Sequence, residues 1–264
     1  MKVLILGAGE MASSVAHRLF RSGFEVTMTE VSQPLAVRRA ISFCSAVWDG
    51  ETVVEGVRGC LFESDRLPMS GRDHVSVVID PEAAILHELK PDVLIDARLL
   101  KCPGATSVRQ APLVISLGPG AVCGVDAHLI VETNRGHDLG RLIETGSAAA
   151  DTGVPGAIGG VTAGRVMRAP CAGVVRGVRK IGDVVKAGEV VAMVGEEPVK
   201  ASIAGVLRGI LHDGVMTTAG LKLADVDPRG EVRACFTITD KSRTISGAVL
   251  EAILHRFKIV NRSA

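Results

Sequence analysis

The first thirty residues constrain the fold more than any other part of the chain. A short apolar run at residues 3–6 is typical of a buried parallel strand. It is followed by the sequence GAGEMA, by a helical pattern that ends at Ser22 and Gly23, and by a second apolar run up to Thr29. This order of strand, glycine loop, helix and strand predicts a Rossmann-type βαβ unit.

The glycine loop carries residues expected for a dinucleotide. Gly7 permits the tight turn, Gly9 lets a pyrophosphate approach the backbone, and Ala12 lets the helix pack on the strand. Glu30 follows Gly7 by 23 residues, close to the ~20 expected for the acid that binds a ribose hydroxyl. Glu10 argues against tight pyrophosphate binding, because its charge at the helix N-terminus repels a phosphate. A Rossmann-type fold kept without its ligand is the alternative.

Apolar runs alternate with helical patterns up to about residue 150. Strands are predicted at residues 75–79, 92–95 and 113–117, and helices at residues 34–43 and 80–90. This alternation predicts an α/β domain over residues 1–150, with a Rossmann-like, doubly wound, mainly parallel sheet that binds ligands at the carboxyl edge of its strands. Arg38 and Arg39 are expected either to hold a phosphate at that edge or to lie on an exposed helix face.

An internal repeat lies within residues 165–230. Residues 171–195 align with residues 203–227 at an offset of 32, and ten positions are identical, against roughly two expected by chance at average amino-acid usage. The pattern of valines and turn glycines resembles biotinyl/lipoyl domains, which implies a small all-β barrel-sandwich hybrid module. Its expected tip at residues 195–198 has no lysine, so neither biotin nor lipoate is expected. Residues 236–264 show a helical pattern and are predicted to pack back onto the body.

The stretch from residue 116 to residue 141 is the candidate catalytic region. Gly118 and Gly120 form a turn that lets a ligand approach the backbone, and a polar cluster follows the next predicted strand. In that cluster Arg135 is expected to hold an anionic group, His137 to transfer a proton, and Glu132 to orient either one or to bind a ligand hydroxyl. The alternative is structural, with Glu132 and Arg135 paired to fix the loop.

The motif LGPG followed by VETNRGHDLGR resembles the YqeB family of selenium-dependent molybdenum hydroxylase system proteins, more distantly related to the XdhC/CoxI maturation factors. The first glycine loop departs from that family's usual GAGDLATG, because this chain reads GAGEMASS, with Glu10 for the acid and Ser14 for the glycine. This resemblance implies an accessory role in hydroxylase maturation and a molybdopterin-type or nucleotide ligand. The implied partners are a molybdenum hydroxylase apoenzyme or other maturation proteins, and a homo-oligomer stays open. An NAD(P)-dependent oxidoreductase is the first alternative, although the chain has no tyrosine for hydride-transfer chemistry. A non-catalytic scaffold that docks the target enzyme is the second.

Composition excludes several other classes of protein. A net charge of +1 and an aromatic content of 3% argue against nucleic-acid binding. The six cysteines contain no CxxC pair, which indicates a reducing compartment and no zinc or other metal site. No apolar run reaches the ~20 residues needed to cross a bilayer, and the N-terminal run is too short for a signal peptide, so a cytoplasmic location without membrane contact is expected.

Overall fold

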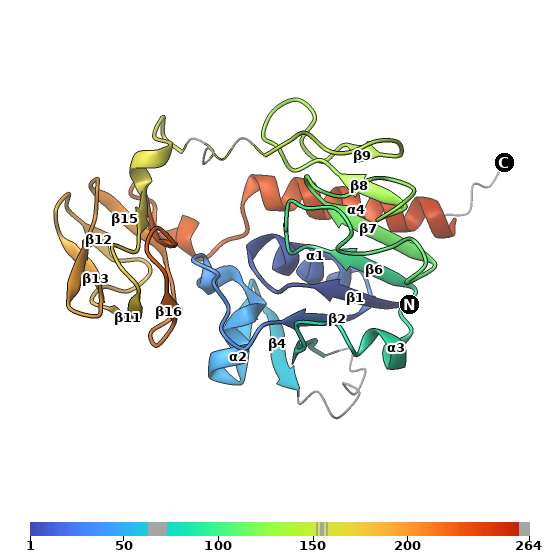
Figure 1. Ribbon diagram of the computed structural model, residues 1–264, viewed down its shortest axis with the longest axis horizontal. Helices are drawn as coiled ribbons and strands as arrows, with labels where there is room; N and C mark the ends of the chain where they lie inside the picture. Colours follow the sequence, from blue (N-terminus) through green and yellow to red (C-terminus); the bar gives the residue numbers. More distant parts are fainter. Residues whose placement is uncertain (63–72, 152, 154–155, 157, 259–264) are drawn as a thin grey trace.

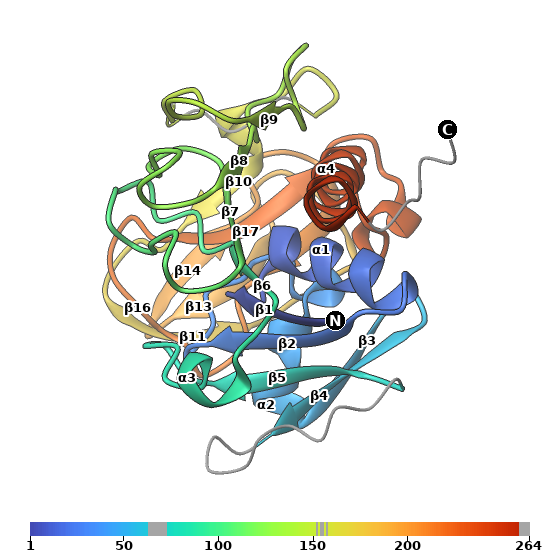
Figure 2. The same cartoon turned by 90° about the vertical axis from the view of Figure 1, so that its right-hand side faces the viewer.

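The computed structural model describes residues 1–62, 73–151, 153, 156 and 158–258. Its larger unit is a nine-stranded sheet with the strand order β3-β4-β5-β2-β1-β6-β7-β8-β9 (Figures 1 and 2). In chain order the strands are β1 (Lys2–Leu6), β2 (Glu25–Glu30), β3 (Glu51–Val54), β4 (Val57–Phe62), β5 (Val75–Ile79), β6 (Val93–Asp96), β7 (Leu113–Leu117), β8 (Leu129–Val131) and β9 (Leu142–Ile143).

The sheet is mixed. The run from β4 to β8 is parallel throughout, whereas the edge strands β3 and β9 are antiparallel to their neighbours β4 and β8. Strands β1, β6 and β7 are apolar along most of their length because both faces of the sheet are covered, and every residue of β6 and β7 is buried. Glu55 and Gly56, both with positive φ, make the two-residue turn between β3 and β4.

The two long helices cover one face of this sheet. Helix α1 (Glu10–Arg21) and helix α4 (Asp240–Phe257) lie side by side on that face, where the Arg18 Nε–H donates to Ser246 Oγ at 2.9 Å (Figure 2). The opposite face is covered by the four-residue helix α3 (Leu86–Leu89) and by loop side chains such as Ala121 and Ala127. Helix α4 thus packs on the sheet unit, and residues 259–264 of the predicted helical segment lie outside the described part of the chain.

Residues 163–227, which we call the β module, contain two four-stranded antiparallel sheets with the orders β10-β17-β15-β12 and β14-β13-β11-β16. Strands β11, β12 and β13 recur 32 residues later as β15, β16 and β17, and the two copies exchange β12 and β16 between the sheets. The bounds are β10 (Val166–Arg168), β11 (Gly173–Gly177), β12 (Val184–Val185), β13 (Val190–Val194), β14 (Glu197–Lys200), β15 (Gly205–Ile210), β16 (Met216–Thr217) and β17 (Lys222–Asp227).

The predicted fold class, a Rossmann-like doubly wound sheet followed by a barrel-sandwich hybrid, is therefore wrong. The structure has a mixed nine-stranded sheet and two antiparallel sheets in its place. A doubly wound sheet needs a covering helix in most crossovers. Here residues 34–43 form turns and the short 3-10 helix η1 (Arg39–Ile41) instead of the predicted helix, and the helix predicted at residues 80–90 shrinks to α3.

The segment that fails to become a helix is the contact between the two units. The Arg39 Nε–H donates to the carbonyl oxygen of Ile210 in β15 at 3.1 Å. Gly209 lies so close to this segment that an added Cβ would sit 2.6 Å from the carbonyl oxygen of Val37. Farther along, the rings of Trp48 and His212 stack with their centroids 4.5 Å apart. The β module is therefore packed directly against the sheet unit.

None of the helices in the described ranges is both long and apolar enough to span a lipid bilayer.

Candidate functional site

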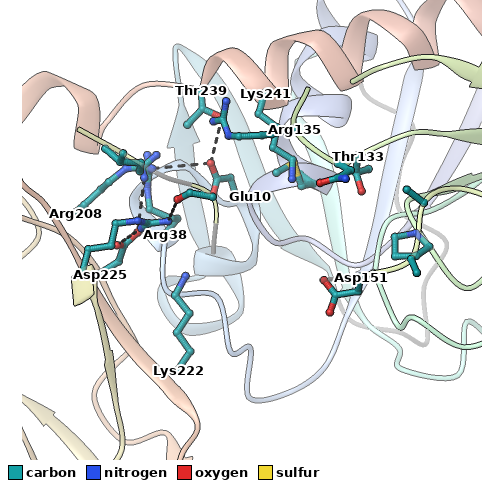
Figure 3. Close-up of a pocket in the computed structure, with 18 residues that line it drawn as sticks. Glu10, Arg38, Thr133, Arg135, Asp151, Arg208, Lys222, Asp225, Thr239 and Lys241 are labelled. Carbon is teal, nitrogen blue, oxygen red and sulfur yellow. Dashed lines mark hydrogen bonds and ion pairs between the residues drawn. The ribbon is translucent and has the colours of Figure 1, made fainter. Parts of the chain in front are cut away.

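A pocket of about 340 Å³ lies where the sheet unit, the start of α4 and the β module meet (Figure 3). The sheet unit contributes the first turn of α1, the loop before η1, and the loops after β7 and β8. The β module contributes residues from η3 (Ala163–Arg165), β15 and β17. The charged lining residues are Glu10, Arg38, Arg135, Asp151, Arg165, Arg208, Lys222, Asp225 and Lys241. These six cations and three carboxylates leave the described lining with an excess of three positive charges.

Arg38 is the most buried of these cations, with 4% of its side chain exposed. Its Nη2–H donates to the carbonyl oxygen of Ala234 at 3.1 Å, but Nε and Nη1 have no hydrogen-bond partner among the described residues. The nearest carboxylate oxygen, on Glu10, is 3.9 Å from Nη1. A buried guanidinium with unused donors is costly, and burial lowers the pKa of Arg38.

Two further arginines reach the pocket from the β module. Arg165 pairs with Asp225, but its Nε lacks a partner among the described residues. Arg208 is 9% exposed in its side chain, lies 3.7 Å from Asp225 and 4.0 Å from Asp227, and has no hydrogen bond in the described structure. Asp227 is already held by Arg229 through two hydrogen bonds of 2.7 and 3.0 Å. Three arginines at this pocket therefore have N–H groups without a hydrogen-bond partner among the described residues.

Two lysines complete the cationic lining. Neither Lys222 nor Lys241 forms an ion pair with a described carboxylate, and burial lowers the pKa of both ammonium groups. Figure 3 shows Lys222 extending toward the group formed by Arg38, Arg208 and Asp225. Lys241 stands in the first turn of α4, which is capped by Thr239 through a 3.2 Å hydrogen bond from the Ser242 amide. Both lysines keep their three donors available to a ligand.

The predicted catalytic residues are only partly brought together. Arg135 lines the pocket, but both arms of its guanidinium donate to Asp240, at 2.9 and 3.1 Å. Glu132 is buried and accepts from the backbone amides of Asn134 and Ala149, each at 2.7 Å. His137 is exposed and does not line the pocket. The structure gives Glu132 a structural task, and the catalytic roles of all three residues stay predictions.

The glycine loop of α1 is partly closed by the protein itself. Gly7 has φ +93°, and Ala12 is buried under α1. Glu30 Oε2 accepts from the Ala8 amide at 2.8 Å and Oε1 from its neighbour Val31 at 2.9 Å, while burial raises the pKa of this carboxyl. Each oxygen that was expected to bind a ribose hydroxyl therefore already accepts one backbone hydrogen bond and keeps one further acceptor site. Gly9 begins α1 in an extended conformation, with open space where a Cβ would be.

The turn glycines after β7 are packed against other loops. Gly118 and Gly120 have φ values of +75° and +111°. An added Cβ would lie 2.6 Å from Thr133 Oγ1 at Gly118, and 2.5 Å from the Cys102 amide nitrogen at Gly120. Both glycines are thus required by the protein's own packing, and Pro119 between them lines the pocket.

The sequence analysis missed the residues that the β module brings to the pocket. The signal was present in the internal repeat: Val190 and Met193 of the first copy correspond to Lys222 and Asp225 of the second. Charged residues in an otherwise apolar strand indicate a buried polar site. Arg208 is one of the ten positions that are identical in the two copies and aligns with Arg176, but Arg176 is exposed and Arg208 is buried.

Fold and pocket together define a two-unit protein with a cationic pocket at the junction of its units. In the described ranges, no three His, Cys, Asp or Glu side chains are grouped so that they could hold a metal ion.

Comparison of the sequence with known proteins finds a relative that matches nearly the whole chain. The chain is 46% identical over 254 residues to the uncharacterized protein YqeB of Escherichia coli (strain K12), a match that covers 96% of the chain. This similarity confirms the resemblance to the YqeB family. The chain spans about half the length of that relative, 47% of it. The more distant relation to XdhC/CoxI factors stays a prediction, and no protein-family model matches the chain.

Solved structures show only weak likeness. An aspartoacylase family protein from Mesorhizobium loti has 14% identity and a TM-score of 0.29, with 85% of this chain and 84% of that chain covered. A succinylglutamate desuccinylase/aspartoacylase from Rhodobacter sphaeroides has 16% identity and a TM-score of 0.27, with the same coverage. Nothing about the activity of this chain follows from similarity at this level.

Proposed function

We propose that this protein is an accessory factor in the maturation of selenium-dependent molybdenum hydroxylases, and that it binds a nucleotide or molybdopterin-type cofactor in the pocket between its units. The observation that carries the binding role is the set of buried guanidinium nitrogens of Arg38, Arg165 and Arg208 that have no described partner at this pocket. The role in maturation is the expectation that the resemblance to the YqeB family implies, since the relative from Escherichia coli is itself described as uncharacterized.

The pocket residues fit the anionic part of such a ligand. A planar guanidinium presents paired N–H donors that match phosphate oxygens, and Lys222 and Lys241 add unpaired charge. A volume of about 340 Å³ lies at the lower end of the ~300–1,000 Å³ typical of small-molecule sites. A bound molybdopterin-type cofactor supplies sulfur ligands for molybdenum, while the residues of this chain hold its phosphate.

The charge pattern also suits ligand transfer. Glu10 shares the pocket with Arg38 and accepts a 3.4 Å hydrogen bond from Thr239 Oγ1, so the cations have an internal counter-ion when the ligand leaves. A carrier must release what it binds, and such a counter-ion lowers the cost of the empty state. The partner in this proposal is the hydroxylase apoenzyme or another maturation protein, and the site of action is the cytoplasm.

The test is complementation of a strain that lacks the gene. Parent protein, Arg38→Gln and Lys222→Val are produced at matched soluble levels, with Arg176→Gln as the control because Arg176 is exposed and away from the pocket lining. We expect the parent and R176Q to restore hydroxylase activity and molybdenum content, and R38Q and K222V to restore little of either. Full restoration by both pocket variants would overturn the proposal.

A further inference from the structure

The two copies of the repeat in the β module differ in one consistent way. Strand β13 of the first copy reads VVAMV and its counterpart β17 reads KLADVD, so Lys222 and Asp225 replace the apolar residues Val190 and Met193. Strand β11 has a single buried residue, Val175, whereas β15 is buried from Val206 to Ile210, where Gly209 contacts the sheet unit. Polar residues thus appear in the copy that borders the pocket, at positions that are apolar in the other copy.

The charges at this corner of the pocket do not balance. Four cations, Arg38, Arg165, Arg208 and Lys222, share the two carboxylates of Glu10 and Asp225. Asp227 adds nothing, because Arg229 already holds both of its oxygens. Two positive charges therefore remain uncompensated among the described groups. Uncompensated buried charge is strongly unfavourable, and a ligand with two negative charges removes that cost.

We infer that the second repeat copy is the anion-binding half of the pocket, and that it takes the dianionic phosphate or diphosphate group of the ligand. This inference deepens the proposed function and rests on it for the identity of the pocket. A tetrahedral phosphate offers several acceptor oxygens in different directions, which matches unused N–H groups on three separate guanidinium groups. A single carboxylate neutralises only one charge and presents its acceptors in one plane.

Binding at this corner has a structural consequence. Arg38 belongs to the sheet unit, whereas Arg208 and Lys222 belong to the β module, so one phosphate contacts both units. This site differs from the glycine loop, where a Rossmann-type protein binds pyrophosphate. In this chain the Ala8 amide of that loop donates its hydrogen bond to Glu30. The phosphate is placed by the β module and not by the loop that the sequence motif indicates.

The experiment is isothermal titration of the purified full-length chain with pyrophosphate and with inorganic phosphate, at low and moderate ionic strength. Lys222→Val copies the residue of the first repeat and removes one cation, and Arg208→Gln removes a second. Arg176→Gln, at the equivalent exposed position, is the matched control for R208Q. We expect pyrophosphate to bind the parent and R176Q equally, and K222V and R208Q to lose about tenfold or more in affinity. Thermal denaturation checks that each variant is folded.

The outcomes separate the two claims. No binding of pyrophosphate or phosphate to the parent, equal losses in R176Q and R208Q, or unchanged binding in folded K222V would each overturn the inference. If pyrophosphate binding follows the expected pattern while K222V and R38Q still restore full hydroxylase activity in cells, the anion site stands and the maturation role fails. If those variants lose maturation but the parent binds neither anion, the role stands and the phosphate assignment fails.

Discussion

Individual side chains divide into those that hold the loops and those that face the pocket. Glu132, predicted as a catalytic group, is the clearest case of the first kind. One of its oxygens accepts a hydrogen bond from the Asn134 amide and the other accepts one from the Ala149 amide, so the side chain links two loop segments. Arg38 is the clearest case of the second kind, because it is buried and keeps two nitrogens without a described partner. The sequence predicts that both residues lie near strand ends, but it does not show that one holds a loop and the other faces the pocket.

Replacing Glu132 with alanine is expected to lower stability. The change leaves the amides of Asn134 and Ala149 without acceptors at a buried site, and each loss costs about 1–3 kcal/mol. His137→Ala, at an exposed position in the same loop, is expected to change stability by less than about 0.5 kcal/mol. Denaturant unfolding of both variants checks this, and equal stability of E132A and the parent would contradict it.

The pair of Arg135 and Asp240 gives a prediction about pH. The guanidinium of Arg135 lowers the pKa of Asp240 to about 2, below its value in the unfolded chain. The pair therefore stabilises the protein above about pH 4, and its contribution disappears as the pH falls toward 2. Because the Asp240 side chain is mostly exposed, we expect only about 0.5 kcal/mol.

Asp240→Asn is the variant that tests this. It should be slightly less stable than the parent at pH 7 and should approach the parent at pH 3, when Asp240 begins to be protonated. A stability difference that grows on acidification would contradict the assignment.

Elements with strong local patterns were predictable, and elements decided by tertiary contacts were not. The strands predicted at Val75–Ile79 and Leu113–Leu117 form with those bounds, because apolar runs of this length, each broken by a single serine, suit a sheet covered on both faces. The helix predicted at residues 34–43 fails, since its arginines bond to Ala234 and Ile210 of the chain beyond the sheet. No local pattern in the sequence reports such a distant contact.

The same limit applies to the candidate site. Its sheet-side part was partly anticipated through Arg38, Arg135 and the turn beside Pro119. Its β-module part depends on which copy of the repeat packs against the sheet unit. The sequence does not show which copy this is, because the two copies are identical at ten positions. Comparing the copies position by position reveals Lys222 and Asp225, but only packing shows that they meet Arg38.

Gly177 and Gly209 occupy equivalent positions in the two copies of the repeat. Because β15 packs closely against the sheet unit, we expect replacement by alanine to lower stability more at Gly209 than at Gly177. At Gly209 a methyl group would collide with the backbone of Val37, so Gly209→Ala should cost about 1–3 kcal/mol through overpacking. At Gly177 the same methyl group would meet only the end of the exposed Asp213 side chain, 3.0 Å away, so a smaller loss is expected. Thermal unfolding compares the two variants, and a larger loss in G177A would argue against this interface.

At the scale of the whole molecule, the pocket joins two units that would otherwise meet mainly through the segment around Arg39 and the stacked pair of Trp48 and His212. An anion held by both units adds to this contact. A ligand bound only by the folded protein raises stability by mass action, so pyrophosphate should raise the melting temperature of the parent and not of K222V.

Ligand affinity is expected to fall as the pH rises from 7 to 10. Burial lowers the pKa of Lys222 and Lys241, so these ammonium groups lose their protons at lower pH than an ordinary lysine. A deprotonated lysine no longer attracts a phosphate, and affinity decreases with it. Pyrophosphate titrations across this range check the prediction, with Lys222→Val showing a shallower dependence. Affinity that stays constant up to pH 10 would show that the lysines take no part in binding.

The most direct test of the central claim is native mass spectrometry of the protein isolated from cells that make the selenium-dependent hydroxylase. A phosphate-bearing small molecule, of nucleotide or pterin type, should accompany the parent chain at a defined mass. It should be absent from the Lys222→Val and Arg208→Gln variants and present in Arg176→Gln. A parent chain that carries no ligand and takes up neither nucleotide nor pterin cofactor when these are added would contradict the account.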